Sequence, residues 1–165
     1  MISFKCPDCG ELHEGSPSVA YRAPYYWSEE YREKDPEKSK LDSDVCIIEE
    51  QYFFIRCVMR IPIIGEEEPF LWGVWVSQSK DNYRHYVETF HASPERATFG
   101  YLSNRLGGYE DTLGLKTMAH WQSNGQRPWI ELEPSDHALY QDWSQGISWD
   151  RAGALAFPHD HRGNA

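Results

Sequence analysis

The residues best suited to chemistry in this sequence are its cysteines, of which Cys6 and Cys9 are separated by two residues and followed by Gly10. Two thiolates at this spacing on a tight turn supply half of a tetrahedral zinc site, and glycine permits the turn around the metal. A structural site needs four ligands, and His13 and Cys46 are the nearest candidates to complete it. The pattern therefore predicts a zinc-binding knuckle made of Cys6, Cys9, His13 and Cys46, with a structural and not a catalytic metal.

Two other interpretations of the Cys6-x-x-Cys9 pair stay open. The two thiols can be unligated and partly buried, because no second Cys-x-x-Cys pair exists in the sequence. The pair can also be a redox dithiol, although such motifs usually follow a strand and open a helix. Cys57 and the remaining histidines are weaker candidates for the missing zinc ligands.

Histidines close to carboxylates form a second set with chemical potential. His120 lies in a predicted strand not far in sequence from Glu131, and His137 follows Asp136 at the start of a predicted helix. A histidine close to a carboxylate can act in general acid–base catalysis, so a small hydrolase using His120, His137 and Glu131 is one hypothesis. The alternation of Glu131 and Glu133 is equally typical of the solvated face of a sheet.

The aromatic residues suggest a binding surface, since aromatic side chains concentrate at interfaces and in ligand pockets. Trp72 and Trp75 point to opposite faces of one predicted strand, so at least one of them belongs to the core. We expect one or two of the later tryptophans to stay partly exposed, from Trp121, Trp129, Trp143 and Trp149. The candidate binding residues are Trp72, Trp75, Trp121, Arg127 and Trp129.

Composition limits the kinds of partner. The chain has 165 residues and a formal net charge of −10, which opposes binding to nucleic acid or to an anionic membrane and favours a neutral or basic partner. The same charge also simply keeps a protein soluble. There is no apolar run of the roughly 18 residues that a membrane span needs, and no secretory signal, so we expect a cytoplasmic protein.

The elements that must position these residues are mostly strands. Runs of β-branched and aromatic residues predict strands over 45–48, 52–61, 70–77, 98–103, 115–122 and 129–133. The strand at 70–77 is apolar on both faces, which indicates a central strand covered on both sides. Asn124-Gly125 predicts a two-residue hairpin turn, whereas Glu49-Glu50-Gln51 is a poor turn sequence.

Short helices are predicted where serine can act as the N-cap. The candidate caps are Ser28, Ser79, Ser135 and Ser148, and the helix after Ser79 should end near Ser93-Pro94. We therefore predict an α+β fold, with a mainly antiparallel twisted sheet, a few short helices packed on it and an N-terminal Cys-containing knuckle. The expected single domain comprises the knuckle (1–15), a polar helix and loop (16–43), the sheet with one inserted helix (44–134), C-terminal helices (135–157) and a tail (158–165).

Several short motifs taken together carry a family resemblance. They are Cys6-Pro-Asp-Cys9-Gly10, Ser43-Asp-Val-Cys46, Phe53-Phe-Ile-Arg56, Trp72-Gly-Val-Trp-Val-Ser77, Asp111-Thr-Leu-Gly-Leu-Lys-Thr117 and Glu131-Leu-Glu-Pro134. With these motifs the chain resembles the bacterial family known as domain of unknown function 2199 over nearly its whole length. The resemblance implies an intracellular, single-domain bacterial protein and transfers no activity. Two positions depart from the family pattern, because Glu49-Glu50 and Cys57 stand where the family usually has glycine.

We expect this protein to be a non-enzymatic protein-binding module. Its acidity, its many aromatic residues and the lack of a complete catalytic set all favour an immunity-like role, in which the protein neutralises a basic protein partner. The alternatives are the small hydrolase described above and a structural accessory domain with a zinc knuckle.

Overall fold

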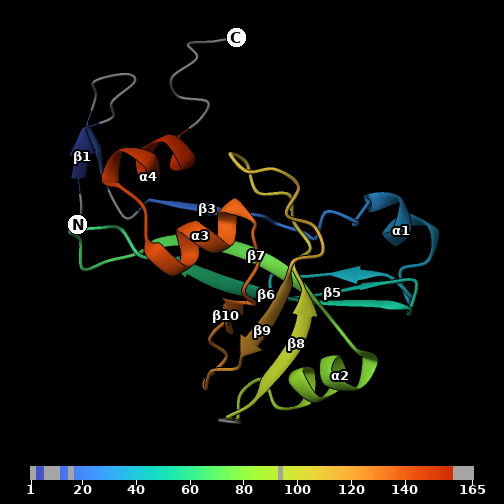
Figure 1. The fold of residues 1–165 in the computed structure, drawn as a ribbon. Helices are drawn as coiled ribbons and strands as arrows, with labels where there is room; N and C mark the ends of the chain where they lie inside the picture. Colours follow the sequence, from blue (N-terminus) through green and yellow to red (C-terminus); the bar gives the residue numbers. More distant parts are fainter. Residues whose placement is uncertain (1–2, 6–11, 15–16, 93–94, 158–165) are drawn as a thin grey trace.

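The computed structural model describes residues 3–5, 12–14, 17–92 and 95–157. Within these ranges the chain forms an α+β fold with an eight-stranded mixed sheet, a separate two-stranded sheet and four short helices (Figure 1). The predicted fold class is confirmed, but two strand pairs in the sheet are parallel. In the two-stranded sheet, β1 (Ser3–Lys5) pairs with β2 (Leu12–Glu14). The segment between them, which holds Cys6 and Cys9, lies outside the described residues, and so does the predicted knuckle.

The main sheet has the strand order β3-β7-β6-β10-β9-β8, with β5 added to β6 and β4 added to β5. Its strands are β3 (Ser18–Ala20), β4 (Lys40–Leu41), β5 (Val45–Ile48), β6 (Tyr52–Ile61), β7 (Phe70–Gln78), β8 (Ala97–Tyr101), β9 (Lys116–His120) and β10 (Trp129–Leu132). Antiparallel pairs dominate, and the parallel pairs are β3 with β7 and β6 with β10. Strands β5 and β6 have the bounds that the sequence predicts.

The long antiparallel pair of β6 and β7 forms the centre of the structure, in register from Phe53 opposite Gln78 to Ile61 opposite Phe70. Side chains alternate between the two faces of a strand, so β7 contributes to two core clusters. Trp72 belongs to the larger cluster, whereas Trp75 packs in a smaller one with Cys46, Ile48 and Phe54. The prediction that this strand is central and covered on both sides is confirmed.

The sheet curls until β8 returns to β7. A bridge joins Val76 to Leu102, and the Ser103 amide donates to the Trp75 carbonyl oxygen at 2.8 Å. The two backbones approach so closely at Gly100 that a β-carbon there would lie less than 3.0 Å from the Ser77 carbonyl oxygen. Glycine is therefore required sterically at the point where β8 crosses β7.

The turn between β5 and β6 is tight despite its sequence. Glu49 and Glu50 both adopt left-handed backbone conformations, with φ of 53° and 54°. Two hydrogen bonds hold them there, because the Glu49 amide donates to Ser39 Oγ at 2.8 Å and the Glu50 amide donates to the Lys38 carbonyl oxygen at 2.9 Å. Contacts with the segment before β4 thus replace the turn chemistry that glycine would supply.

The Asn124-Gly125 pair also has left-handed backbones, with φ of 58° and 71°, but the predicted two-residue hairpin is wrong. Strand β9 ends at His120 and β10 begins at Trp129, so residues 121–128 form a longer connection. The Gly125 amide donates to the carbonyl oxygen of Phe90, just after the helix over 80–88, and this bond connects the turn to the end of that helix.

The helices are α1 (Glu29–Lys34), α2 (Lys80–Glu88), α3 (Ala138–Gln145) and α4 (Trp149–Ala156). Ser28, Ser79 and Ser148 act as N-caps as predicted. The predicted cap Ser135 is wrong, because its hydroxyl accepts from the His137 amide and the His137 side chain caps α3 instead. Helix α2 also ends earlier than predicted, at Glu88, with Thr89 as its C-cap. None of the helices described is long and apolar enough to cross a membrane.

Replacing Gly100 with alanine should destabilise the protein by about 3 kcal/mol, because the added methyl group meets the backbone of β7 and not a movable side chain. Urea-induced unfolding followed by tryptophan fluorescence measures this loss. Gly107→Ala is the matched control, since nothing lies within 4 Å of a β-carbon at Gly107. Equal unfolding midpoints for the two variants would contradict the close crossing.

Candidate functional site

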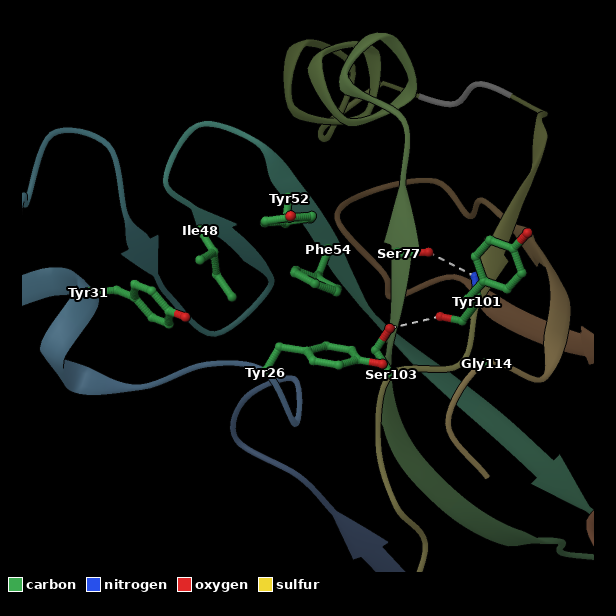
Figure 2. A pocket seen from close by; sticks show the side chains of 9 residues that line it. All are labelled: Tyr26, Tyr31, Ile48, Tyr52, Phe54, Ser77, Tyr101, Ser103 and Gly114. Carbon is green, nitrogen blue, oxygen red and sulfur yellow. Dashed lines mark hydrogen bonds between the residues drawn. The ribbon is translucent and has the colours of Figure 1, made fainter. Parts of the chain in front are cut away.

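A hollow of about 610 Å³ opens where the β5–β6 hairpin faces the end of β8 and the loop before α1. Aromatic side chains dominate its lining, which consists of Tyr26, Tyr31, Ile48, Tyr52, Phe54, Ser77, Tyr101, Ser103 and Gly114 (Figure 2). Figure 2 shows Tyr26, Tyr52 and Phe54 gathered about its middle, with Tyr31 toward one end and Tyr101 toward the other. We call this hollow the tyrosine groove.

The floor of the groove is built by the central strands. Tyr52 and Phe54 are two residues apart on β6, so both side chains point to the same face. Ile48 on β5 is the register partner of Tyr52 and lies on that face as well. Ile48 and Phe54 are buried in the smaller core cluster, and this rigid apolar floor leaves Tyr52 standing at its edge.

The loop before α1 supplies another wall and is fixed by buried hydrogen bonds. Asn104 connects this loop to the sheet, because its Oδ1 accepts from the Trp75 amide at 2.7 Å and its Nδ2 donates to the Ala23 carbonyl oxygen at 2.9 Å. The Tyr25 amide donates to the Ser103 carbonyl oxygen at 2.8 Å. The Tyr26 ring then stacks on Phe54, with the ring centroids 6.1 Å apart.

Exposed aromatic surface is concentrated in and beside the groove. Tyr52 is 56% exposed, Tyr26 is 49% exposed and Tyr101 is 47% exposed. Exposed Tyr25 packs against Tyr26, and exposed Phe99 packs against Tyr101. Only two other large apolar side chains in the described residues are exposed, Ile64 and Val87. Exposed apolar surface that is concentrated in this way makes the groove the candidate site.

The two serine hydroxyls of the groove are engaged within it, and the other polar side-chain groups of the lining are the hydroxyls of its four tyrosines. Ser77 Oγ accepts from the Tyr101 amide at 2.9 Å, and Ser103 Oγ donates to the Tyr101 carbonyl oxygen at 2.8 Å. None of the nine lining residues that the structure places here is an aspartate, glutamate, histidine, cysteine or lysine. Aromatic side chains therefore supply most of the lining, and no histidine–carboxylate pair is among these nine residues.

Among the residues considered for catalysis, the structure brings together His120 and Glu131, whose Nε2 and Oε1 atoms are 3.3 Å apart. The His120 ring lies nearly parallel to the Trp129 ring, with centroids 4.0 Å apart, and the Arg60 guanidinium lies over the same tryptophan at 5.1 Å. His120 is thus held by its stack on Trp129 and its contact with Glu131.

His137 is not part of that cluster. Its Nδ1 accepts from the Leu139 amide at 3.0 Å and caps α3, and its Nε2 lies 3.0 Å from the Asp111 carbonyl oxygen. A neutral imidazole that carries its proton on Nε2 satisfies both contacts. The position of His137 accounts for a structural role, joining α3 to the loop before β9.

Burial of the tryptophans corrects the predicted binding set. Trp72, Trp75 and Trp121 are 1%, 0% and 6% exposed, so their rings are core and present no face to a partner. Trp129 is half-buried between His120 and Arg60. Trp143 and Trp149 are half-buried too, so three of the four later tryptophans are partly exposed where one or two were predicted.

Arg127, the basic member of that set, pairs with Asp44 at 3.3 Å. On one side of β6, the first half of the strand pairs with β5 and the second half pairs with β10. The ion pair lies where these two neighbouring strands meet and connects them.

The sequence interpretation missed the tyrosines that form the groove. The available signal was the Tyr25-Tyr26 pair, together with Tyr52 at the start of one predicted strand and Tyr101 within another. The neighbouring residues in the sequence do not distinguish these tyrosines from those of the core, because only the curl of the sheet brings them together.

The predicted zinc ligands divide between two regions. Cys6 and Cys9 lie outside the described residues, and His13 lies in β2 opposite Phe4. Cys46 is fully buried in the smaller core cluster, where burial raises the pKa of its thiol to about 12. Within the described ranges no three His, Cys, Asp or Glu side chains are grouped to hold a metal ion. Zinc binding stays a prediction that rests on Cys6 and Cys9.

Removing the imidazole cap should weaken α3. We expect His137→Ala to lower the free energy of unfolding by about 1 kcal/mol, whereas His137→Asn should retain most of the stability because asparagine is a good N-cap. Urea titration of the two variants beside the wild type measures the difference. If asparagine proves as harmful as alanine, His137 does not act through its capping bond.

Alkaline pH should destabilise the fold. Burial raises the pKa of Cys46 from 9.0 to about 12, and burial likewise raises the pKa of Tyr83 from 10.0 to about 12. The unfolded chain therefore loses these protons first, and stability present below pH 9.0 is lost as the pH rises toward about 12. Urea unfolding at several pH values measures the slope, which should be shallower in Cys46→Ala. A slope that is unchanged in this variant would rule out the Cys46 contribution.

Comparison with known proteins identifies a family. The family model described as "Uncharacterized protein conserved in bacteria (DUF2199)" matches residues 5–147. No curated protein and no protein of solved structure gives a significant match.

Proposed function

The chain belongs to this bacterial family of uncharacterised proteins, DUF2199, and on that premise we propose its function from its own surface. We propose that it is a non-enzymatic binding module that takes a segment of a basic partner protein into the tyrosine groove. One observation carries the proposal: three tyrosines that are each about half exposed surround a preformed apolar floor.

Tyrosine suits protein recognition in particular. Its ring supplies a large contact area at a low cost in conformational entropy, and its hydroxyl tolerates both water and a polar partner. The hydroxyls of Ser77 and Ser103 are both used within the groove, so the remaining polar side-chain groups of its lining are the hydroxyls of its four tyrosines. Nucleic acid is disfavoured by the net charge of −10. The chemistry of the groove therefore supports a polypeptide occupant.

Charge supports a basic partner. A net charge of −10 attracts a positively charged protein over long distances and raises the rate of association. Exposed Glu49 and Glu50 lie in the turn between Ile48 and Tyr52, which both line the groove. An immunity-like role, in which this protein blocks a basic partner, is one form that such binding takes. The free buried thiols of Cys46 and Cys57 fit a reducing compartment, and we place this binding in the cytoplasm.

The alternative functions have weaker support. A hydrolase built on His120 and Glu131 would need a nucleophile and room for a substrate, whereas His120 is stacked against Trp129. A structural accessory role with a zinc knuckle depends on Cys6 and Cys9 alone.

Truncating the groove tyrosines should abolish partner binding without unfolding the protein. The partner is first captured from lysate of the source bacterium, identified by mass spectrometry and purified, and its affinity is then measured by calorimetry. We expect Tyr52→Ala and Tyr101→Ala each to weaken binding at least about tenfold, as loss of an interface anchor does.

The control variant is Ile64→Ser, which removes the most exposed large apolar side chain in the described residues but lies beyond the opposite end of β6 from Tyr52. Its affinity should stay within about twofold of the wild type. Equal binding by all three variants would show that the partner does not use the groove, and the proposal would then fail. An acidic partner would also overturn the electrostatic part of it.

A further inference from the structure

Arginine side chains of this chain cover aromatic rings at many places in the fold. In the described residues five arginine guanidinium groups lie over rings at distances of 4.7–5.6 Å, in the pairs Arg32 over Trp27, Arg60 over Trp129, Arg96 over Trp121, Arg105 over Tyr25 and Arg151 over Tyr109. No pair of this kind involves Tyr26, Tyr52 or Tyr101 in the part of the chain that the structure describes. Among the exposed rings of the described residues, Tyr25 is covered by an internal arginine, whereas the groove tyrosines and the neighbouring Phe99 are not.

The rim of the groove shows how an arginine stacks there. The Arg105 guanidinium lies 4.7 Å from the centre of the Tyr25 ring, and Tyr25 packs edge-on against Tyr26 at 5.8 Å. An internal cation therefore already occupies the aromatic surface immediately outside the groove. Inside the groove the corresponding ring surface, on Tyr52 and Tyr101, is open to a cation from another molecule.

The shape of the groove also fits a long side chain with a cationic end. Ile48 and Phe54 form an apolar floor that can cover the methylene groups of such a side chain. The planar guanidinium stacks on aromatic faces and is more weakly hydrated than an ammonium, so it loses less on entering an aromatic site. Glu49 and Glu50 are exposed next to the Tyr52 end and add negative charge there.

From these uncovered ring faces we infer that the tyrosine groove recognises an arginine side chain of the partner, whose guanidinium stacks on Tyr52 and whose aliphatic part lies on Ile48 and Phe54. This inference rests on the proposed function and specifies its chemistry. At five other places in the fold, an arginine of this chain lies over one of its own aromatic rings. In the groove the chain provides the aromatic ring, and the partner provides the guanidinium.

Three short peptides of equal length test this inference on the full-length protein: hexa-arginine, hexa-lysine and hexa-citrulline. Hexa-lysine matches the charge of hexa-arginine, and hexa-citrulline matches its shape without the charge. Binding is measured by calorimetry at about 0.15 M salt, and the tyrosine ring signals are followed by NMR. We expect hexa-arginine to bind about tenfold more tightly than hexa-lysine, and hexa-citrulline to bind only weakly.

Variants then locate the preference. Tyr52→Phe should retain it because the phenyl ring keeps its face, Tyr52→Ala should lose it, and Ile64→Ser should leave it unchanged. Equal affinity for hexa-arginine and hexa-lysine, or a preference that survives both Tyr52→Ala and Tyr101→Ala, would overturn the inference and leave only attraction by net charge. If the peptides show no arginine preference but binding of the purified partner is still weakened by Tyr52→Ala, the proposed protein-binding function stands and the arginine assignment alone is wrong.

Discussion

Strand β8 crosses β7 so closely that its residue at the crossing has no room for a side chain, and much of the structure depends on this approach. The crossing at Gly100 lets the last strand in the sheet order bond to the second, through the Val76–Leu102 bridge and the bond between Ser103 and Trp75. The curl encloses the larger core cluster between β6, β7 and the C-terminal helices. It also carries Tyr101 and Ser103 to the side of Ser77, where they complete a groove that β5 and β6 alone would leave open.

Buried polar bonds then fix this arrangement in a single geometry. Asn104 connects the Trp75 backbone to the loop that carries Tyr26, and Thr112 connects the Asn104 carbonyl oxygen to the Leu106 amide. Asn104 and Thr112 are almost completely buried, so loss of either would leave unpaired polar groups away from water. The groove is consequently preformed, and a preformed site loses little free energy to ordering when a partner binds.

The two kinds of large aromatic residue are used differently. Tryptophans supply bulk to the core on both faces of β7, where Trp75 also donates its ring N–H to the Tyr21 carbonyl oxygen. Tyrosines line the groove, because a ring with a terminal hydroxyl can face water and still offer apolar area. The chain carries a net charge of −10, and Glu49 and Glu50 are exposed in the turn beside this aromatic site. Long-range attraction, together with ring faces that no internal arginine covers, favours a cationic segment of a protein.

Side-chain alternation and capping chemistry act over a few residues, and for this reason the sequence alone determined the fold class, the bounds of β5 and β6, the two-sided burial of β7 and the serine caps of α1, α2 and α4. The cap of α3 was missed because the contact that orients the His137 ring comes from the Asp111 carbonyl oxygen, which is distant in the sequence. Strand order, the parallel pairs and the crossing at Gly100 depend on contacts between residues far apart in the chain, which no local period encodes. The tertiary structure therefore decided which aromatic residues became core and which became surface. Tyr26, Tyr52 and Tyr101 come from three separate segments, and only the curled sheet brings them around one groove.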